Sequence, residues 1–244
     1  MKAISCDRLL LLFLAALALL MLAVFPARAD TKEAIAKKMM SLIDAHREML
    51  AVGDFARLDA GMNKIQAEYE KGQWTDVQLW NLFEGPFNAG DPAFEELYNK
   101  WVAAYPKSYA AHYARGAYYF RLVWRYAGKS DQTAEAKRVA VASLQDYTAS
   151  LSLTAKPLLT YSQLMGLYAL TKDSDKIRAI YDGAVKLDPR NSMARVAYMN
   201  VLSQVGTTAE MQAVATDLRK TGADDDEMSG DESFLCPAVQ GRPV

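Results

Sequence analysis

Residues 158–191, LLTYSQLMGLYALTKDSDKIRAIYDGAVKLDPRN, give the clearest indication of the fold class. Apolar residues recur at helical spacing on both sides of a short polar turn, Thr171-Lys172-Asp173. This pattern predicts two helices, Leu158–Leu170 and Ser174–Leu187, joined as a hairpin. Lys186-Leu187-Asp188-Pro189 ends the second helix, because proline cannot continue one.

The hairpin resembles a tetratricopeptide repeat, a helix-turn-helix unit of about 34 residues. Its aromatic, leucine, small and proline positions fall on Tyr161, Leu164, Tyr168, Tyr181, Ala184 and Pro189. Two positions depart from the pattern. Met165 stands at the usual glycine, with Gly166 one place later, and Ile177 stands at a position that is usually small.

Similar helical spacing continues on both sides of this unit. It predicts further helices over Ser192–Val205, Thr208–Lys220, Ser108–Tyr126 and Ala134–Leu153, and a divergent cap over Lys32–Leu50 and Phe55–Lys71. No convincing alternation of apolar and polar residues occurs, so strands are not expected. The predicted fold class is all-α, with tetratricopeptide-like antiparallel helical hairpins stacked as a short α-solenoid.

The N-terminus has the three parts of a secretory signal peptide. Lys2 and Arg8 precede the apolar run Leu9–Phe25, and Ala27-Arg28-Ala29 offers a cleavage site. We therefore predict a signal peptide over residues 1–29, cleavage after Ala29, and a periplasmic or secreted protein. The alternative is an uncleaved membrane anchor, since the run approaches the length of a bilayer span. No later segment is long and apolar enough to cross a membrane.

The C-terminal segment differs in composition from the rest. Residues 222–244 are rich in acidic residues, glycine, serine and proline, so we expect a disordered acidic tail after a helical domain over residues 30–221. Cleavage after Ala29 would leave Cys236 as the sole cysteine. An internal disulfide is then excluded, and packing alone must stabilise the exported domain.

The charge balance bears on the class of partner. The chain carries 28 basic and 29 acidic residues, a formal net charge of −1. That balance argues against a strongly basic nucleic-acid binder. We expect a protein or peptide partner, no nucleic acid, and no membrane contact after signal cleavage; the oligomeric state stays open.

Beyond the repeat, a longer string is similar to a family of uncharacterised bacterial proteins. The string contains Trp101-Val102, Tyr105-Pro106-Lys107-Ser108-Tyr109, Ala114-Arg115-Gly116, Trp124-Arg125 and Leu187-Asp188-Pro189. The family is a domain of unknown function with tetratricopeptide-like helices, and the resemblance covers about Phe55 to Leu218. Ser203–Thr208 lacks the proline, tryptophan and paired glycines typical of the family. The resemblance implies the fold and carries no activity or cofactor.

Sequence signals of catalysis are lacking. His46 and His112 are the two histidines, and no metal-binding spacing, phosphate-binding glycine loop or nucleophile elbow occurs. Asp44, His46 and Glu48 alternate along one helix and point apart, so a solvated helix surface is expected there. We predict no enzyme activity, no cofactor and no metal.

The segment Ser108–Tyr126 is the best candidate for a binding surface. In the repeat register its groove positions are Tyr109, His112, Gly116 and Tyr119, with Arg115 beside them. Tyrosine and arginine are favoured at binding surfaces. Arg195 and Asn200 are weaker groove candidates. The alternative places Tyr113, Tyr118, Phe120 and Trp124 in the core and pairs Arg125 with a carboxylate of a neighbouring helix.

Three functional hypotheses remain. The first is an exported protein- or peptide-binding or scaffold module that uses the concave face of its first helices. The second is an envelope hydrolase with an active site dispersed over several helices. The third is a structural role in the envelope without a defined small ligand.

Overall fold

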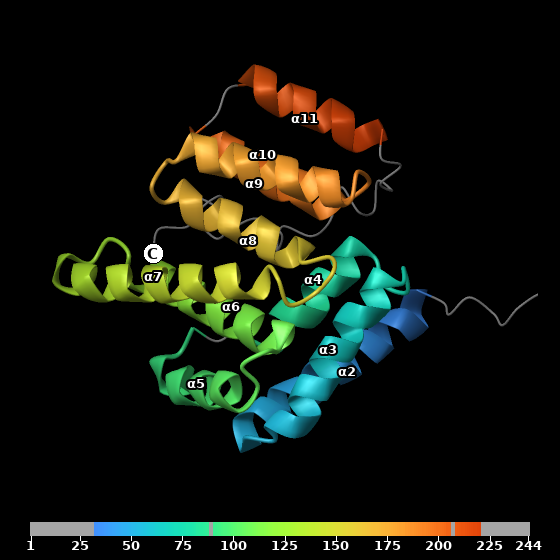
Figure 1. The fold of residues 1–244 in the computed structure, drawn as a ribbon, viewed down its shortest axis with the longest axis vertical. Coiled ribbons are helices and arrows are strands. Elements are labelled where there is room, and N and C mark those ends of the chain that lie inside the picture. The colour runs from blue at the N-terminus through green and yellow to red at the C-terminus, as the bar shows by residue number, and fades with distance from the viewer. Residues whose placement is uncertain (1–31, 88–89, 206–207, 221–244) are drawn as a thin grey trace, which may run out of the picture. The chain divides into compact units, whose positions relative to one another are not determined.

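A computed structural model describes residues 32–87, 90–205 and 208–220, and within these ranges all regular secondary structure is helical (Figure 1). The chain divides into two units, residues 1–38 and 39–244; the first is described only over residues 32–38, which are helical. The α-helices are α2 (Lys32–Val52), α3 (Phe55–Glu70), α4 (Asp76–Glu84), α5 (Glu95–Ala104), α6 (Tyr109–Tyr126), α7 (Thr133–Ser150), α8 (Leu158–Ala169), α9 (Ser174–Leu187), α10 (Ser192–Val205) and α11 (Thr208–Lys220). Single 3-10 turns span Pro92–Phe94 and Ser130–Gln132.

The all-α fold class is confirmed, and several predicted helix bounds agree with the structure. The bounds of α9, α10 and α11 are those predicted, and α8 ends one residue before the predicted Leu170. Helix α7 begins at Thr133 and ends at Ser150, whereas Ala134–Leu153 was predicted. The predicted signal peptide and acidic tail lie outside the described residues. No helix in the described ranges is long and apolar enough to cross a membrane.

Local side-chain caps mark the starts of several helices. The Ser108 hydroxyl accepts from the backbone N–H of Ala111 at the start of α6. Asp91 accepts from Ala93 N–H ahead of Pro92, and the short 3-10 turn there leads into α5. At α4, Thr75 and Gln78 form a reciprocal capping box.

Consecutive helices pair as hairpins in the second unit. Contacts join α6 to α7, α8 to α9, and α10 to α11, and α8 also contacts α7 and α10. Glycine allows close approach at two of these contacts. A Cβ on Gly116 would lie 2.8 Å from the Tyr147 ring, and one on Gly183 would lie 3.1 Å from the Tyr161 ring.

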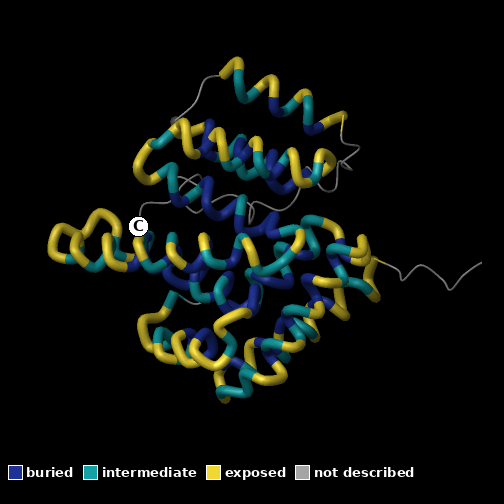
Figure 2. Tube along the Cα trace, in the orientation of Figure 1, coloured by how far each residue is buried: buried dark blue, intermediate teal, exposed yellow. Residues whose placement is uncertain are grey.

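The helices before the hairpins supply part of the same core. Leu79, Leu82 and Phe83 of α4 are fully buried. Helix α6 is buried along most of its length, whereas the outer turns of α7 and α11 carry many exposed residues (Figure 2). Helix α6 contacts α3, α5, α7 and α8, so it is enclosed by neighbours on several sides.

Candidate functional site

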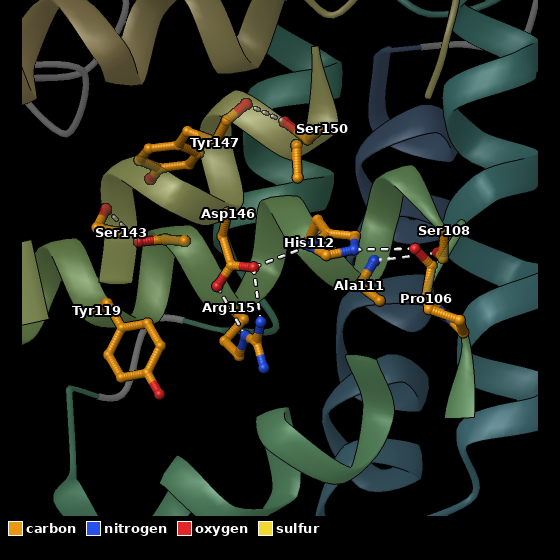
Figure 3. Close-up of polar contacts among 12 residues, drawn as sticks. Pro106, Ser108, Ala111, His112, Arg115, Tyr119, Ser143, Asp146, Tyr147 and Ser150 are labelled. Carbon is orange, nitrogen blue, oxygen red and sulfur yellow. Dashed lines mark hydrogen bonds and ion pairs between the residues drawn. The ribbon is translucent and has the colours of Figure 1, made fainter. Parts of the chain in front are cut away.

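His112 joins the first turn of α6 to α7 (Figure 3). Its Nδ1 lies 2.8 Å from Oδ1 of Asp146, and its Nε2 lies 3.1 Å from the carbonyl oxygen of Pro106. The Pro106 carbonyl and an ionised Asp146 carboxylate can both only accept hydrogen bonds. The protonated imidazole, which carries a hydrogen on each ring nitrogen, can therefore donate to both. The bond to Asp146 is the main reason that the pKa of His112 is raised, against the opposing effect of burial.

Arg115, one turn further along α6, donates hydrogen bonds to the same carboxylate. Its Nε and Nη2 donate to the two oxygens of Asp146 at 2.7 and 2.8 Å, and its Nη1 donates to Oδ1 of Asn99 at 3.1 Å. The Asp146 side chain is only 4% exposed. A buried carboxylate needs such partners, and the forked guanidinium geometry matches it closely.

Tyr119 extends the same set of contacts to α5. Its hydroxyl donates to Glu95 at 3.1 Å and to Asn99 at 3.3 Å. Arg138 of α7 donates to both oxygens of Glu95 at 2.9 and 3.1 Å. Burial, with the negative charge of Glu95, raises the pKa of Tyr119. The structure thus brings three predicted residues together in a network across α5, α6 and α7. We call it the Asp146 cluster: Glu95, Asn99, His112, Arg115, Tyr119, Arg138 and Asp146.

The Asp146 cluster has an exposed rim and a buried anchor. Asn99 is exposed, the side chain of Arg115 is 22% exposed and that of His112 is 13% exposed. The rim presents the guanidinium of Arg115 and the imidazole of His112, which Asp146 holds in place, and the carboxamide of Asn99, which accepts from Arg115 and Tyr119. Such an arrangement can hydrogen-bond a polar partner at little cost in side-chain ordering.

The His112–Asp146 contact also has the geometry of the base and orienting acid in a Ser-His-Asp triad. In those sites the second ring nitrogen faces a nucleophile, but here Nε2 faces the Pro106 carbonyl. The nearby Ser108 hydroxyl caps α6 and accepts from Asn63 Nδ2 at 2.9 Å. In this structure Nε2 of His112 therefore contacts a carbonyl oxygen where the base of a triad contacts its nucleophile.

Most of the chain matches a known protein family. Residues 43–224 match the model of a family described as a domain of unknown function (DUF4034). The chain belongs to this family. The match confirms the predicted resemblance to an uncharacterised family, over a somewhat longer range than expected. No curated protein and no solved structure matches the chain.

Tyr109, another predicted groove residue, lies in the core of this DUF4034 chain. It is 2% exposed, and its ring packs against Phe83 of α4 and Tyr113 of α6, with centroids 5.9 Å away in each case. Gly116 faces Tyr147 of α7. Burial raises the pKa of Tyr109. Tyr109 therefore faces other helices rather than solvent, and we leave it out of the proposed surface.

The two weaker candidates lie on α10. Arg195 is 3% exposed and donates to Asp217 of α11 at 2.8 Å and to the carbonyls of Asn191 and Pro189 at 2.7 and 2.8 Å. These bonds tie the start of α10 to α11. Asn200 is half-buried near the end of α10. Neither residue joins the Asp146 cluster in the contacts of the described chain.

Sequence reasoning missed Asp146, although a signal existed. Val139, Ser143, Asp146 and Ser150 are spaced by four, three and four residues, the spacing of one buried helix face. An acid on such a face requires a cationic or hydrogen-bonding partner, and α6 offers both in Arg115 and His112. Asn99 and Glu95 gave no comparable signal.

The alternative core assignment on α6 agrees with most of the structure. Tyr113, Tyr118 and Phe120 are buried, and Trp124 is half-buried. Among the described residues, Arg125 forms no ion pair with a carboxylate, which that alternative expected. Its Nη1 donates to the carbonyl of Gly90 at 2.9 Å, and Arg121 instead forms an ion pair with Glu84 of α4.

The expectation of a solvated surface around His46 is wrong for the histidine itself. Asp44 and Glu48 are exposed, but His46 is 3% exposed. A Cβ at Gly61 of α3 would lie 2.5 Å from Nε2 of His46. The absence of a side chain at Gly61 therefore provides the space that the imidazole ring occupies. Burial lowers the pKa of His46. Within the described ranges, no group of three or more His, Cys, Asp and Glu side chains is placed to hold a metal ion.

Proposed function

We propose that the protein is an exported helical-repeat module that binds a protein or peptide partner. In this proposal the hairpins α6–α7, α8–α9 and α10–α11 are tetratricopeptide-like units stacked as a short α-solenoid. Two features support it: the order of helix contacts along the chain, and the stacking of Tyr181 of α9 on Tyr198 of α10 at 4.1 Å between ring centroids. Repeats of this kind bury a common core and leave extended surfaces for partners.

The rim of the Asp146 cluster is the observation that carries the binding proposal. Arg115, His112 and Asn99 come from two helices and are fixed by contacts to buried or neighbouring groups. Side chains held in place before binding lose little conformational entropy when a partner arrives. Arginine is also enriched among the residues that dominate binding energy. We therefore propose this rim as the partner surface.

The test is capture of a partner from a periplasmic extract with the wild type and two matched variants. Arg115→Lys keeps a positive charge beside Asp146 but loses the forked donor geometry. Arg190→Lys makes the same change in the exposed turn before α10. We expect the wild type and Arg190→Lys to recover the same partner, with affinity for Arg115→Lys about tenfold weaker, a loss of about 1.4 kcal/mol.

A melting-temperature comparison separates binding from folding. If Arg115→Lys binds as the wild type does, the rim is not the partner surface. If all three proteins recover no partner reproducibly, the binding proposal itself fails. A loss of binding counts in its favour only where the melting temperature of Arg115→Lys stays close to that of the wild type.

The second candidate is a hydrolase, and the His112–Asp146 pair is the observation that favours it. A broad hydrolase screen, run with and without a chelator, tests this activity. Turnover that disappears in His112→Gln but persists in His46→Gln would support the hydrolase over the binding module.

A further inference from the structure

Helix α4 buries its apolar face against the first helices of the hairpins. Leu79, Leu82 and Phe83 are fully buried, and α4 contacts α10. The ring of Phe83 lies 5.3 Å from that of Tyr113 on α6, in an edge-to-face arrangement. Burial of this extent makes α4 part of the folded core rather than a loosely attached helix.

Three carboxylates in the segment Glu70–Glu84, which runs from the end of α3 to the end of α4, accept hydrogen bonds from the hairpins or from the loop before α8. The first is Glu70, at the end of α3. It accepts from the backbone N–H of Lys156 at 3.0 Å and from the hydroxyl of Thr154, both in the loop that leads into α8. Burial opposes ionisation of Glu70, but the hydrogen bonds from Thr154, Gln66 and this loop lower its pKa overall.

The second is Asp76, in the first turn of α4. Its Oδ2 accepts from the backbone N–H of Ser192 at 2.7 Å and from the Ser192 hydroxyl at 2.9 Å. Its Oδ1 accepts from the hydroxyl of Tyr69 at 2.7 Å. Asp76 therefore caps the start of α10 from a distant part of the chain and places a negative charge at its positive end.

The third is Glu84, at the end of α4. It accepts from the hydroxyl of Tyr113 on α6 at 2.7 Å and from Nε2 of Gln163 on α8 at 3.2 Å, and it forms an ion pair with Arg121 on α6. One carboxylate thus connects α4 to the first helices of two hairpins.

In these contacts the acceptors and the donors lie on different parts of the chain. The segment Glu70–Glu84 supplies the carboxylates, and the first helices α6, α8 and α10, or the loop before α8, supply the donors. We infer that this segment, made of the end of α3, a turn and the amphipathic helix α4, is an internal acidic ligand that occupies the face shared by the first helices. The inference rests on the hairpin assignment of the proposed function. The shared face is then filled by the chain itself, and an external partner binds elsewhere, as at the Asp146 cluster.

Hydrogen exchange with mass spectrometry on the full chain tests the attachment. Asp76→Asn removes the charge that caps α10, and Asp175→Asn makes the same change in the exposed first turn of α9. We expect exchange in residues 76–84 and 192–205 to become at least about tenfold faster in Asp76→Asn, with residues 133–150 unchanged. The control should match the wild type. Unchanged exchange in residues 192–205 of Asp76→Asn would overturn the inference.

A milder variant covers the case in which Asp76→Asn does not fold. Ser192→Ala removes the hydroxyl donor to Asp76 and leaves the backbone donor in place. We expect a smaller acceleration confined to the same two segments. Acceleration spread evenly over all helices would contradict the proposed local attachment.

Occupancy of the shared face is tested with a labelled peptide of residues 73–87, titrated into the wild type and followed by fluorescence anisotropy. No saturable binding is expected, because the chain's own segment holds the face. Saturable binding would overturn the inference, since the face would then be open. Both measurements use no external partner, so their outcome is independent of the capture experiment with Arg115→Lys.

Discussion

At the scale of single residues, the two histidines lie in opposite surroundings. His112 faces Asp146 and a carbonyl oxygen, and the resulting bonds raise its pKa. His46 lies against Gly61 with little exposure, and burial lowers its pKa. Folding therefore favours the charged form of His112 and the neutral form of His46. Their contributions to stability must change in opposite directions with pH.

We predict that His112 stabilises the fold mainly in acid. Its folded pKa lies above the unfolded value of about 6.5, so the stabilisation is fully present below that pH and is lost as the pH rises through the folded pKa. Free energies of urea unfolding for the wild type and His112→Gln, taken from about pH 5 to about pH 9, measure this dependence. The cost of the substitution should shrink as the pH rises. A cost independent of pH would contradict the assignment.

His46→Gln is the matched control, with the opposite sign. The folded pKa of His46 is depressed, so its contribution is present above about pH 6.5 and is lost as the pH falls through the folded pKa. The wild type should therefore lose stability relative to His46→Gln on acidification. Parallel curves for the two substitutions would show that the two environments do not differ as described.

Individual residue roles were partly predictable from the sequence. The core positions Tyr113 and Tyr118 follow from helical spacing, which depends on local order alone. The grouping of His112 and Arg115 was predicted, but their shared partner Asp146 lies 31 or more residues away along the chain. A buried acid can be suspected from its spacing; the residue that neutralises it depends on how α6 and α7 pack.

At the scale of elements, the α6–α7 hairpin depends on close approach at Gly116. We predict that Gly116→Ala destabilises the protein by about 1–3 kcal/mol, because the new methyl group would meet the Tyr147 ring. Thermal unfolding measures the loss. Gly166→Ala is the matched helical control, where the new Cβ would lie 3.3 Å from the far edge of the Phe120 ring. Equal stability of Gly116→Ala and the wild type would show that the rings rearrange freely.

A second variant distinguishes steric conflict from altered helix propensity. Tyr147→Leu removes the ring that the new methyl group would meet. The double variant with Gly116→Ala and Tyr147→Leu should therefore lose less stability than the two single variants lose in total. Alanine by itself favours helix over glycine by about 0.5–1 kcal/mol, so a loss in Gly116→Ala cannot come from propensity.

Helix boundaries differ in how far the sequence determines them. Asp173, Pro189 and the turn before Ser192 set the limits of α9 and α10, and these limits were predicted correctly. Helix α4 was not predicted. It has nine residues, too few for strong periodicity or for stability in isolation. Its helical state depends on burial of Leu79, Leu82 and Phe83 by distant helices.

At the scale of the whole chain, attachment of α3 and α4 to the hairpins uses pairs far apart in sequence. Asp76 and Ser192 are separated by 116 residues, and Glu84 and Gln163 by 79. Local patterns carry no information about such pairs. The hairpins could therefore be predicted one by one, whereas the segment that fills their shared face could not. This segment moves the proposed partner surface away from the groove expected for a repeat protein.

The proposed export concerns the whole chain, and it determines the cell fraction in which a partner is sought. We predict that the protein recovered from the periplasm begins at Asp30, because Ala27 and Ala29 suit cleavage after a small residue. Intact-mass measurement and N-terminal sequencing of the fractionated protein give the answer. Ala29→Arg, made with Ala27 and Arg28 left as they are, should block cleavage, so that the uncleaved chain is recovered. Recovery of the full chain in the membrane fraction of the wild type would instead indicate an anchor, and partner capture would then have to be carried out on membranes.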